Sequence, residues 1–272
     1  MIDWLIAKNQ SIQRRESTYL LDVKNLKELE KMRAIITGMN GTLAPFVYDF
    51  LNNNKVEVVV WDRNKIDISN EESVYSFVRE TKPDLFFHIA TGPVTWVEYI
   101  AKVTKELNVK LLFTSSVSVF SEKGTGPYDI TSIPDSLEEY GLYKIECENA
   151  VRAYNPEAII LRLGWQIGDR IGSNNMFDFL AKQQSQKGFI EASSRWFPSC
   201  SFLKDTAETI VSTALVQPSG TYLANSNKKY SFYDIVNHLK QMYHTDWIIR
   251  ESTSFVRDDR MSDERVLIKE LF

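Results

Sequence analysis

The stretch "IITGMNGTLA", residues 35–44, decides how this chain of 272 residues is expected to fold. Gly38 and Gly41 stand between an apolar run and a helical pattern, and Ala44 takes the place of a third small residue. A turn of this kind presents backbone amides and a helix N-terminus to a pyrophosphate, while the small residues allow the close approach. The residues expected to hold a pyrophosphate are Gly38, Asn40, Gly41, Thr42 and Leu43.

The regions around this turn favour a cofactor site over an ordinary glycine turn, because short apolar runs alternate with longer helical patterns. Strands are expected at residues 33–38, 56–62, 84–90, 110–116 and 157–164. Helices are expected at residues 45–53, 70–81, 94–108 and 139–154. Asn70 is expected to cap the second of these helices. The alternation predicts an α/β fold with a Rossmann-like, doubly wound parallel sheet.

The chain divides into three expected segments. Residues 1–31 form an N-terminal extension of unknown role, with one plausible helix at 23–31, and residues 32–166 form the dinucleotide-binding domain. Residues 167–272 are mainly a smaller C-terminal lobe for the substrate, and whether that lobe returns a strand to the sheet is left open. Its expected helices span 174–186, 202–217 and 232–243, with a strand at 220–225.

Composition narrows the class of partner. The net charge is −4 with both signs interspersed, which argues against nucleic acid as a partner. Cys147 and Cys200 have no paired spacing, so a reducing compartment, by default the cytoplasm, is expected. No cleavable leader and no apolar run of the roughly 20 residues that span a membrane is apparent. His88, His238 and His244 lack metal-ligand spacing, so no metal is expected and His88 is interpreted as a packed or capping residue.

"WDR" at residues 61–63 ends the second expected strand, near where a carboxylate receives an adenosine ribose. Asp62 favours a free 2′-hydroxyl, whereas the guanidinium of Arg63 favours a 2′-phosphate. The choice between NAD(H) and NADP(H) therefore stays open, as does the interpretation of both residues as an ordinary strand end.

"EEYGLYKIECE", residues 138–148, places Tyr140 and Lys144 four residues apart, so they are neighbours on a helix. Ser116 ends the strand before that helix, at the sheet edge where ligands bind. A ketone reductase needs an acid, a second donor for the carbonyl oxygen and a cation, which Tyr140, Ser116 and Lys144 supply. Action near neutral pH requires the tyrosine pKa to fall by about three units, with help from Lys144. A solvated pair on a helix face is the competing interpretation.

Five segments together resemble the extended short-chain dehydrogenase/reductase superfamily, and within it the dTDP-4-dehydrorhamnose reductase family. They are "TGMNGTLA" (37–44), "FTSSVSVF" (113–120), "YGLYK" (140–144), "LRLGW" (161–165) and "SFLKDTAETI" (201–210). The resemblance runs from about Arg33 to about Leu267. It implies reduction, by NADPH or NADH, of a 4-keto group on a nucleotide-linked deoxysugar, in polysaccharide biosynthesis, and a possible homodimer.

The resemblance also implies further contacts. Asp67 and Ile68 are expected near the adenine, and Ala90 and Thr91 near the cofactor ribose. The expected substrate contacts are Ser116, Ser118, Trp165 and Pro198. Trp165 is equally open to a place in the core, because an aromatic residue after a strand usually packs there.

Two departures from the family pattern bear on the substrate. After "HIATG" the chain goes directly to the helix and the strand that begins at Lys110, where the family usually inserts a further loop and helix. Val117 and Ser118 stand where the family has an acid and a tyrosine, and Val117 argues against a sugar dehydratase. A non-catalytic NAD(P)-binding subunit, similar to the regulatory β subunit of methionine adenosyltransferase, and a sugar-nucleotide epimerase are the alternatives.

Overall fold

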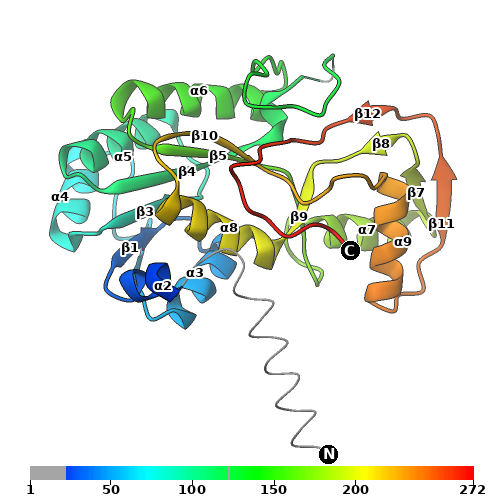
Figure 1. The fold of residues 1–272 in the computed structure, drawn as a ribbon, viewed down its shortest axis with the longest axis horizontal. Coiled ribbons are helices and arrows are strands. Elements are labelled where there is room, and N and C mark those ends of the chain that lie inside the picture. The colour runs from blue at the N-terminus through cyan, green and yellow to red at the C-terminus, as the bar shows by residue number, and fades with distance from the viewer. Residues whose placement is uncertain (1–22, 122) are drawn as a thin grey trace, which may run out of the picture.

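Six parallel strands form the central sheet of the computed structural model, which describes residues 23–121 and 123–272 (Figure 1). Their order is β2-β1-β3-β4-β5-β10. The strands are β1 (Arg33–Ile36), β2 (Glu57–Val60), β3 (Leu85–His88), β4 (Lys110–Ser116), β5 (Ile159–Leu163) and β10 (Gly220–Ala224). β3 and β5 are buried along their whole length, which explains why their sequences are apolar except for His88 and Arg162. The predicted parallel sheet is confirmed.

Helices cover both faces of this sheet (Figure 1). They are α2 (Val23–Leu29), α3 (Ala44–Asn53), α4 (Glu71–Thr81), α5 (Val94–Glu106), α6 (Glu139–Tyr154) and α8 (Leu203–Val216). α3 and α8 pack together on one face, and α4, α5 and α6 pack on the other. A separate buried apolar cluster fills each side, so the sheet is doubly wound as predicted.

Local sequence signals set the helix ends near the site. Pro45 lies in the first turn of α3, where its missing N–H is not needed. The Asn70 side chain accepts a hydrogen bond of 3.0 Å from the Ser73 amide and so caps α4, as predicted. Helix α4 ends at Lys82, which has a left-handed conformation with φ of 48°.

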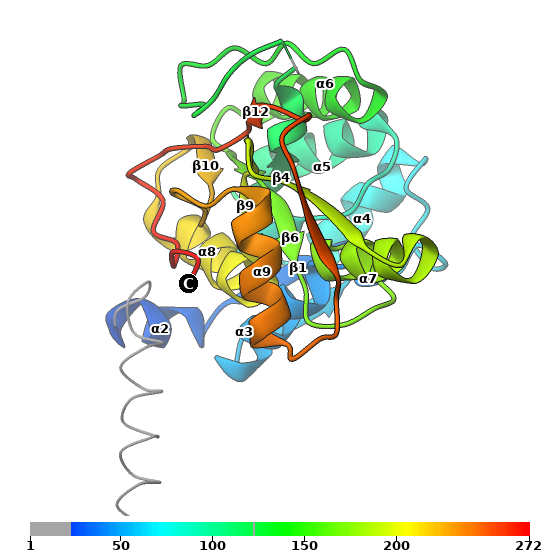
Figure 2. The same ribbon diagram turned by 90° about the vertical axis from the view of Figure 1, so that its right-hand side faces the viewer.

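The C-terminal lobe is built from short strands and two helices. They are β6 (Trp165–Ile167), α7 (Met176–Lys187), β7 (Ile190–Ser193), β8 (Trp196–Phe197), β9 (Cys200–Phe202), α9 (Phe232–Met242), β11 (Ile249–Ser252) and β12 (Arg257–Asp258). The strands pair as β6 with β9, β7 with β11 and β8 with β12. Figure 2 shows α7 and α9 on either side of β11. Aromatic and aliphatic side chains from both helices fill the core of the lobe.

The chain leaves the sheet after β5, builds much of the lobe and then returns. β10 pairs with β5 in parallel, with Thr221 opposite Ile160. Helix α8 precedes β10 and packs on α3. The segment 167–272 therefore contributes both a helix and a strand to the layers of the central sheet.

The C-terminal segment also contacts the loop between β4 and α6. This loop begins with the 3₁₀ turn η1 (Val117–Val119). The Gly126 amide donates to the Asp258 carbonyl at 2.8 Å, and the Tyr128 amide donates to the Arg260 carbonyl at 2.7 Å. The Ser262 amide donates to the Tyr128 carbonyl, also at 2.8 Å. Residues 258–262 therefore hold the loop that leads into α6.

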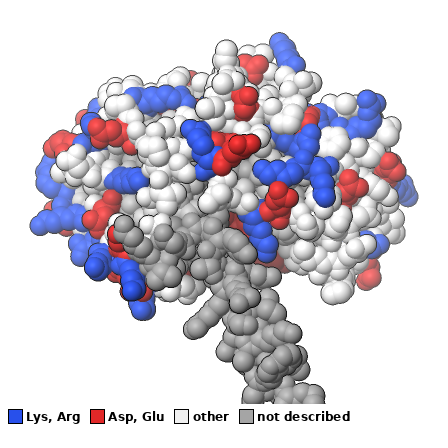
Figure 3. Space-filling model, in the orientation of Figure 1, with Lys and Arg blue, Asp and Glu red and all other residues white. Residues whose placement is uncertain are grey.

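Charged side chains of both signs are interspersed on the face seen in Figure 3. Within residues 23–121 and 123–272, no helix combines the length and the apolar character that crossing a membrane requires.

Candidate active site

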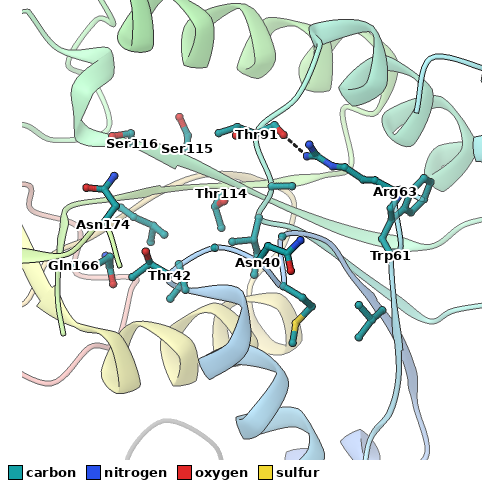
Figure 4. Close-up of a pocket in the computed structure, with 18 of the residues that line it drawn as sticks. Asn40, Thr42, Trp61, Arg63, Thr91, Thr114, Ser115, Ser116, Gln166 and Asn174 are labelled. Carbon is teal, nitrogen blue, oxygen red and sulfur yellow. Dashed lines mark hydrogen bonds between the residues drawn. The ribbon is translucent and has the colours of Figure 1, made fainter. Parts of the chain in front are cut away.

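A cavity of about 1080 Å³ opens at the carboxyl ends of the sheet strands, where the strand order reverses between β1 and β3. This is the position at which open α/β sheets bind their ligands. Its walls come from the loops after β1, β2 and β3, the end of β4, helix α6 and the start of the lobe (Figure 4). The cavity is larger than a site for one drug-sized ligand usually is, so it has room for an extended molecule.

The turn after β1 is shaped by Gly38. Its φ is 92°, and a Cβ placed there would lie 3.0 Å from the Ala90 amide nitrogen. A side chain is therefore excluded both by conformation and by space. The Thr37 hydroxyl accepts hydrogen bonds from the amides of Ile89 and Ala90 at 3.0 and 3.1 Å, which binds the loop after β3 to the turn. The two loops form a backbone cradle of the kind that holds a pyrophosphate.

Arg63 lies at one end of the cavity, and Asn174 and Gln166 lie at the other (Figure 4). The Arg63 guanidinium lies 4.8 Å from the centroid of the Trp96 ring and donates a hydrogen bond to the Thr91 carbonyl. Lys65 also lines this end, with its Nζ 3.6 Å from the Asp62 carboxylate. Two cations therefore accompany Asp62 where a ribose is expected.

The Ser116, Tyr140 and Lys144 side chains meet at the same cavity. The Ser116 hydroxyl is hydrogen bonded to Tyr140, and it also donates to the Ser118 hydroxyl at 3.1 Å. The Lys144 ammonium donates to the Thr114 carbonyl at 2.9 Å and lies 5.9 Å from the centroid of the Tyr140 ring. Tyr140 is 48% exposed, whereas Lys144 is 2% exposed. The phenol therefore faces the cavity and the ammonium is held beneath it.

The pKa of Tyr140 is shifted upward, whereas from the sequence we expected it to be lowered. Desolvation raises the pKa of its phenol, and the hydrogen bond with Ser116 opposes that change only in part. We expected Lys144 to lower this pKa, but the ammonium is directed to the Thr114 carbonyl instead. Desolvation lowers the pKa of Lys144 to about 8. Tyr140 is thus a protonated donor at neutral pH, and Lys144 is a cation close to its titration range.

His88 is a packed residue, in agreement with its interpretation from sequence. It is fully buried, its Nδ1 lies 3.0 Å from the Thr37 hydroxyl, and the Trp96 ring meets it edge to face at 4.7 Å. Burial lowers the pKa of His88 to about 3, with help from the charges of Lys144 and Arg63. Because the Thr37 hydroxyl oxygen accepts hydrogen bonds from two amides, the hydroxyl can donate its own proton in a hydrogen bond to the His88 Nδ1. His88 is a neutral acceptor that orients Thr37.

Most of the predicted site residues line this one cavity. They are Gly38, Asn40, Gly41, Thr42, Leu43, Asp62, Arg63, Ala90, Thr91, Ser116, Tyr140 and Lys144.

Five predicted residues lie outside the cavity lining: Asp67, Ile68, Ser118, Trp165 and Pro198. The Asp67 carboxylate accepts from the amide and hydroxyl of Ser69, and Ile68 packs into the core beneath α4 and α5. Ser118 reaches the site only through its hydrogen bonds with Ser116.

Trp165 packs inside the lobe. Its ring lies 5.2 Å from Phe179 and 6.1 Å from both Trp196 and Phe232, measured between centroids. Pro198 is buried, and its carbonyl accepts from the Asn227 side chain at 2.9 Å. Contacts of these two residues with a substrate stay predictions.

Several residues of the site were not found from sequence. Thr114, Leu163, Gly164, Gln166 and Asn174 line the cavity. Positions at strand ends could have indicated the first three. No local signal marks Gln166 or Asn174, which the fold of the lobe brings to the cavity.

Tyr143 of α6 supports one wall of the cavity. Its hydroxyl accepts a hydrogen bond of 3.1 Å from the Gly92 amide. Helix α6 thereby holds the loop after β3, which forms the cavity wall at Ala90 and Thr91.

Among the residues that the structure describes, no three His, Cys, Asp or Glu side chains are grouped so that they could hold a metal ion. The donors and cations of the cavity are amides, hydroxyls, guanidinium and ammonium, which suit an anionic ligand.

Comparisons with known proteins agree with this geometry. The family model described as RmlD substrate binding domain matches residues 93–253. A dTDP-4-dehydrorhamnose reductase of Aggregatibacter actinomycetemcomitans is 25% identical over 218 residues, covering 74% of this chain and 72% of the relative. Methionine adenosyltransferase 2 subunit beta of Xenopus laevis is 29% identical over 161 residues, covering 50% and 48%. The structure of dTDP-4-dehydrorhamnose reductase from Bacillus anthracis in complex with NADP superposes with a TM-score of 0.76 at 18% identity, covering 88% and 95%.

Proposed function

Because the chain belongs to the family of the RmlD substrate binding domain, we propose that it is an NADP(H)-dependent reductase of a 4-keto group on a nucleotide-linked deoxysugar. Curated relatives support this proposal, since dTDP-4-dehydrorhamnose reductases match most of the chain. The observation that carries it is the meeting of Ser116, Tyr140 and Lys144 in a cavity that also contains the glycine turn.

The residues present fit a phosphorylated dinucleotide. The glycine turn lines the cavity at the N-terminus of α3, which has no side-chain cap, so its backbone amides are available for a pyrophosphate. Arg63 and Lys65 at the ribose end supply two positive charges that favour a 2′-phosphate over the bare hydroxyl that Asp62 would prefer. The surplus of cations supports NADP(H) as the cofactor, and NADPH, when bound, supplies the hydride.

The chain's own residues complete the reduction. The Ser116 hydroxyl orients the ketone oxygen, and the Tyr140 phenol gives it the proton as negative charge develops there. The raised pKa of Tyr140 keeps that proton in place before transfer. Lys144 adds a buried positive charge 5.9 Å from the centroid of the Tyr140 ring, and solvent returns a proton to the phenol because Tyr140 is half exposed. The product is an alcohol, formed from one hydride and one proton.

Replacement of Tyr140 tests this proposal. Tyr140→Phe should keep NADPH binding and lose roughly two to four decades of kcat, the usual effect of removing a positioned acid. The assay is NADPH oxidation, followed by absorbance, with a dTDP-4-keto-6-deoxyhexose. Tyr154→Phe is the matched control, because Tyr154 lies on the same helix but outside the cavity lining and should leave turnover unchanged. Full activity in Tyr140→Phe would contradict the assignment.

A second candidate function is a non-catalytic subunit that binds NADP(H). The match to methionine adenosyltransferase 2 subunit beta and the Val117 and Ser118 substitutions favour it. In that case the protein should bind NADPH, oxidise none of it with any ketosugar, and copurify with a partner enzyme. An epimerase, by contrast, would retain tightly bound NAD through purification.

A further inference from the structure

Three side chains of α6 form one stripe facing the end of β4. Tyr140, Lys144 and Glu148 are each four residues apart, which places them on one helix face. Each contacts a different residue of the strand. Tyr140 is hydrogen bonded to Ser116, Lys144 donates to the Thr114 carbonyl at 2.9 Å, and Glu148 accepts from the Ser115 hydroxyl at 2.6 Å.

Glu148 is the member of this stripe to which the proposed chemistry gives no task. Its carboxylate is 1% exposed and receives two hydrogen bonds from Arg162 of β5, at 2.9 and 2.8 Å. Arg162 is itself 3% exposed. Arg152 donates to the same carboxylate from the surface at 2.7 Å. Burying a carboxylate and a guanidinium is costly unless each compensates the other.

We propose that Glu148 is a positioning residue of the active site, which fixes α6 against β4 and balances the buried charge of Arg162 so that Lys144 stays protonated. This role rests on the proposed function, since it serves the Ser116, Tyr140 and Lys144 site. Without the Glu148 charge, Lys144 would lose a carboxylate that raises its pKa, and the buried Arg162 would lose its ion-pair partner.

The charged and titratable groups around Lys144 support this assignment. They are His88 of β3 and Tyr140, Tyr143, Cys147 and Glu148 of α6, and Arg162 of β5 joins them through its ion pair with Glu148. Burial keeps His88 neutral and raises the pKa values of Tyr140, Tyr143 and Cys147. Desolvation lowers the pKa of Lys144, whereas the Cys147 and Glu148 charges raise it. Lys144 is therefore the group of this set whose charge changes in mildly alkaline solution.

The test measures NADPH binding, by the fluorescence of the bound cofactor, and kcat/KM for the ketosugar between pH 6.5 and 9.5. The affinity for NADPH and kcat/KM should both fall as the pH rises through the pKa of Lys144, because Lys144 is neutral above that pH. Glu148→Gln leaves Arg162 uncompensated and should move this alkaline limb down by roughly one to two pH units. Arg162→Gln leaves Glu148 with only the half-exposed Arg152 as a cationic partner, and it should move the limb upward.

If the limb moves down in Glu148→Gln and up in Arg162→Gln, the effect is electrostatic. Damage to the fold would not be expected to move the limb in opposite directions in the two variants. The double variant Glu148→Gln/Arg162→Met removes both charges and should return the limb toward that of the wild type. Arg152→Gln is the control, since Arg152 is 44% exposed and screened by solvent, and its limb should stay in place. If Glu148→Gln does not fold, the role of Glu148 is decided by the other two variants. The proposal then requires an upward shift of the limb in Arg162→Gln and a return toward the wild type in the double variant.

Lower thermal stability in Glu148→Gln with an unmoved limb would overturn the proposal and leave Glu148 a structural role only. If the wild type binds NADPH but reduces no ketosugar, the proposed function fails, and the limb in NADPH binding still decides the role of Glu148. Absence of NADPH binding to the wild type would overturn both.

Discussion

At the scale of single residues, the site depends on a few side chains whose surroundings change their chemistry. Desolvation raises the pKa of Tyr140, and the same cause lowers the pKa of Lys144 to about 8. Neither effect follows from residue type, since an exposed tyrosine and lysine titrate near pH 10. The Thr114 carbonyl, which directs the Lys144 ammonium, is a backbone group that sequence cannot point out.

Arg63 is the residue expected to select the cofactor. Arg63→Ala should raise the Kd for NADPH about 10- to 100-fold, the scale of a lost charged hydrogen bond, and change the Kd for NADH much less. Fluorescence titration with each nucleotide measures both values. Arg79→Gln is a suitable control, because that arginine is 53% exposed on α4 and outside the cavity lining. Equal losses for the two nucleotides would mean that Arg63 only holds the loop at Thr91.

At the scale of elements, the predicted sheet and its helices were found because their signals are local. Short apolar runs predicted β1 to β5, and the helical spacing of apolar residues predicted the helices. Asn70 indicated the start of α4. The residues predicted from the glycine turn and from the ends of β3 and β4 therefore lie together in the lining of one cavity.

The lobe was harder to predict because its strands are two to four residues long and pair across distant parts of the chain. Such strands have little periodicity of their own. Trp165 shows the consequence, since its ring packs with Trp196 and Phe232, which only the folded lobe brings near. Gln166 and Asn174 reach the cavity for the same reason.

One lobe element offers a test of local stability. Helix α9 begins with a capping box, in which the Ser231 hydroxyl accepts from the Asp234 amide at 3.2 Å and the Asp234 carboxylate accepts from the Ser231 amide at 3.0 Å. Ser231→Ala should lower the free energy of unfolding by about 1 to 2 kcal/mol, as measured by urea denaturation. Ser185→Ala, at an exposed position within α7, should change it by less than about 0.5 kcal/mol. Identical curves for both variants would show that the cap contributes nothing.

At the scale of the whole molecule, the cavity joins the sheet to the lobe. Its walls include the glycine turn of the sheet and also Gln166 and Asn174, which belong to the lobe. A ligand that fills it contacts both parts and should stabilise them together.

Saturating NADPH should therefore raise the melting temperature. At about 100 times its Kd, a ligand stabilises the folded state by about 2.7 kcal/mol, which corresponds to roughly 5 to 10 °C for a chain of this size. Differential scanning fluorimetry measures the shift, with inorganic phosphate at the same concentration as the control. A melting temperature that does not change with NADPH would contradict a cofactor role for this cavity.

The contacts between residues 258–262 and the loop at 126–128 also set an order of events during synthesis. Chains emerge from the ribosome from the N-terminus onward, and folding begins before synthesis is complete. When β1 to β5 have emerged from the ribosome, residues 258–260 have not yet been added. The carbonyls of Asp258 and Arg260, which accept the amides of the loop at 126–128, are therefore still missing. The approach to Tyr140 is therefore finished only when that late segment arrives, so an incomplete chain does not present the mature site.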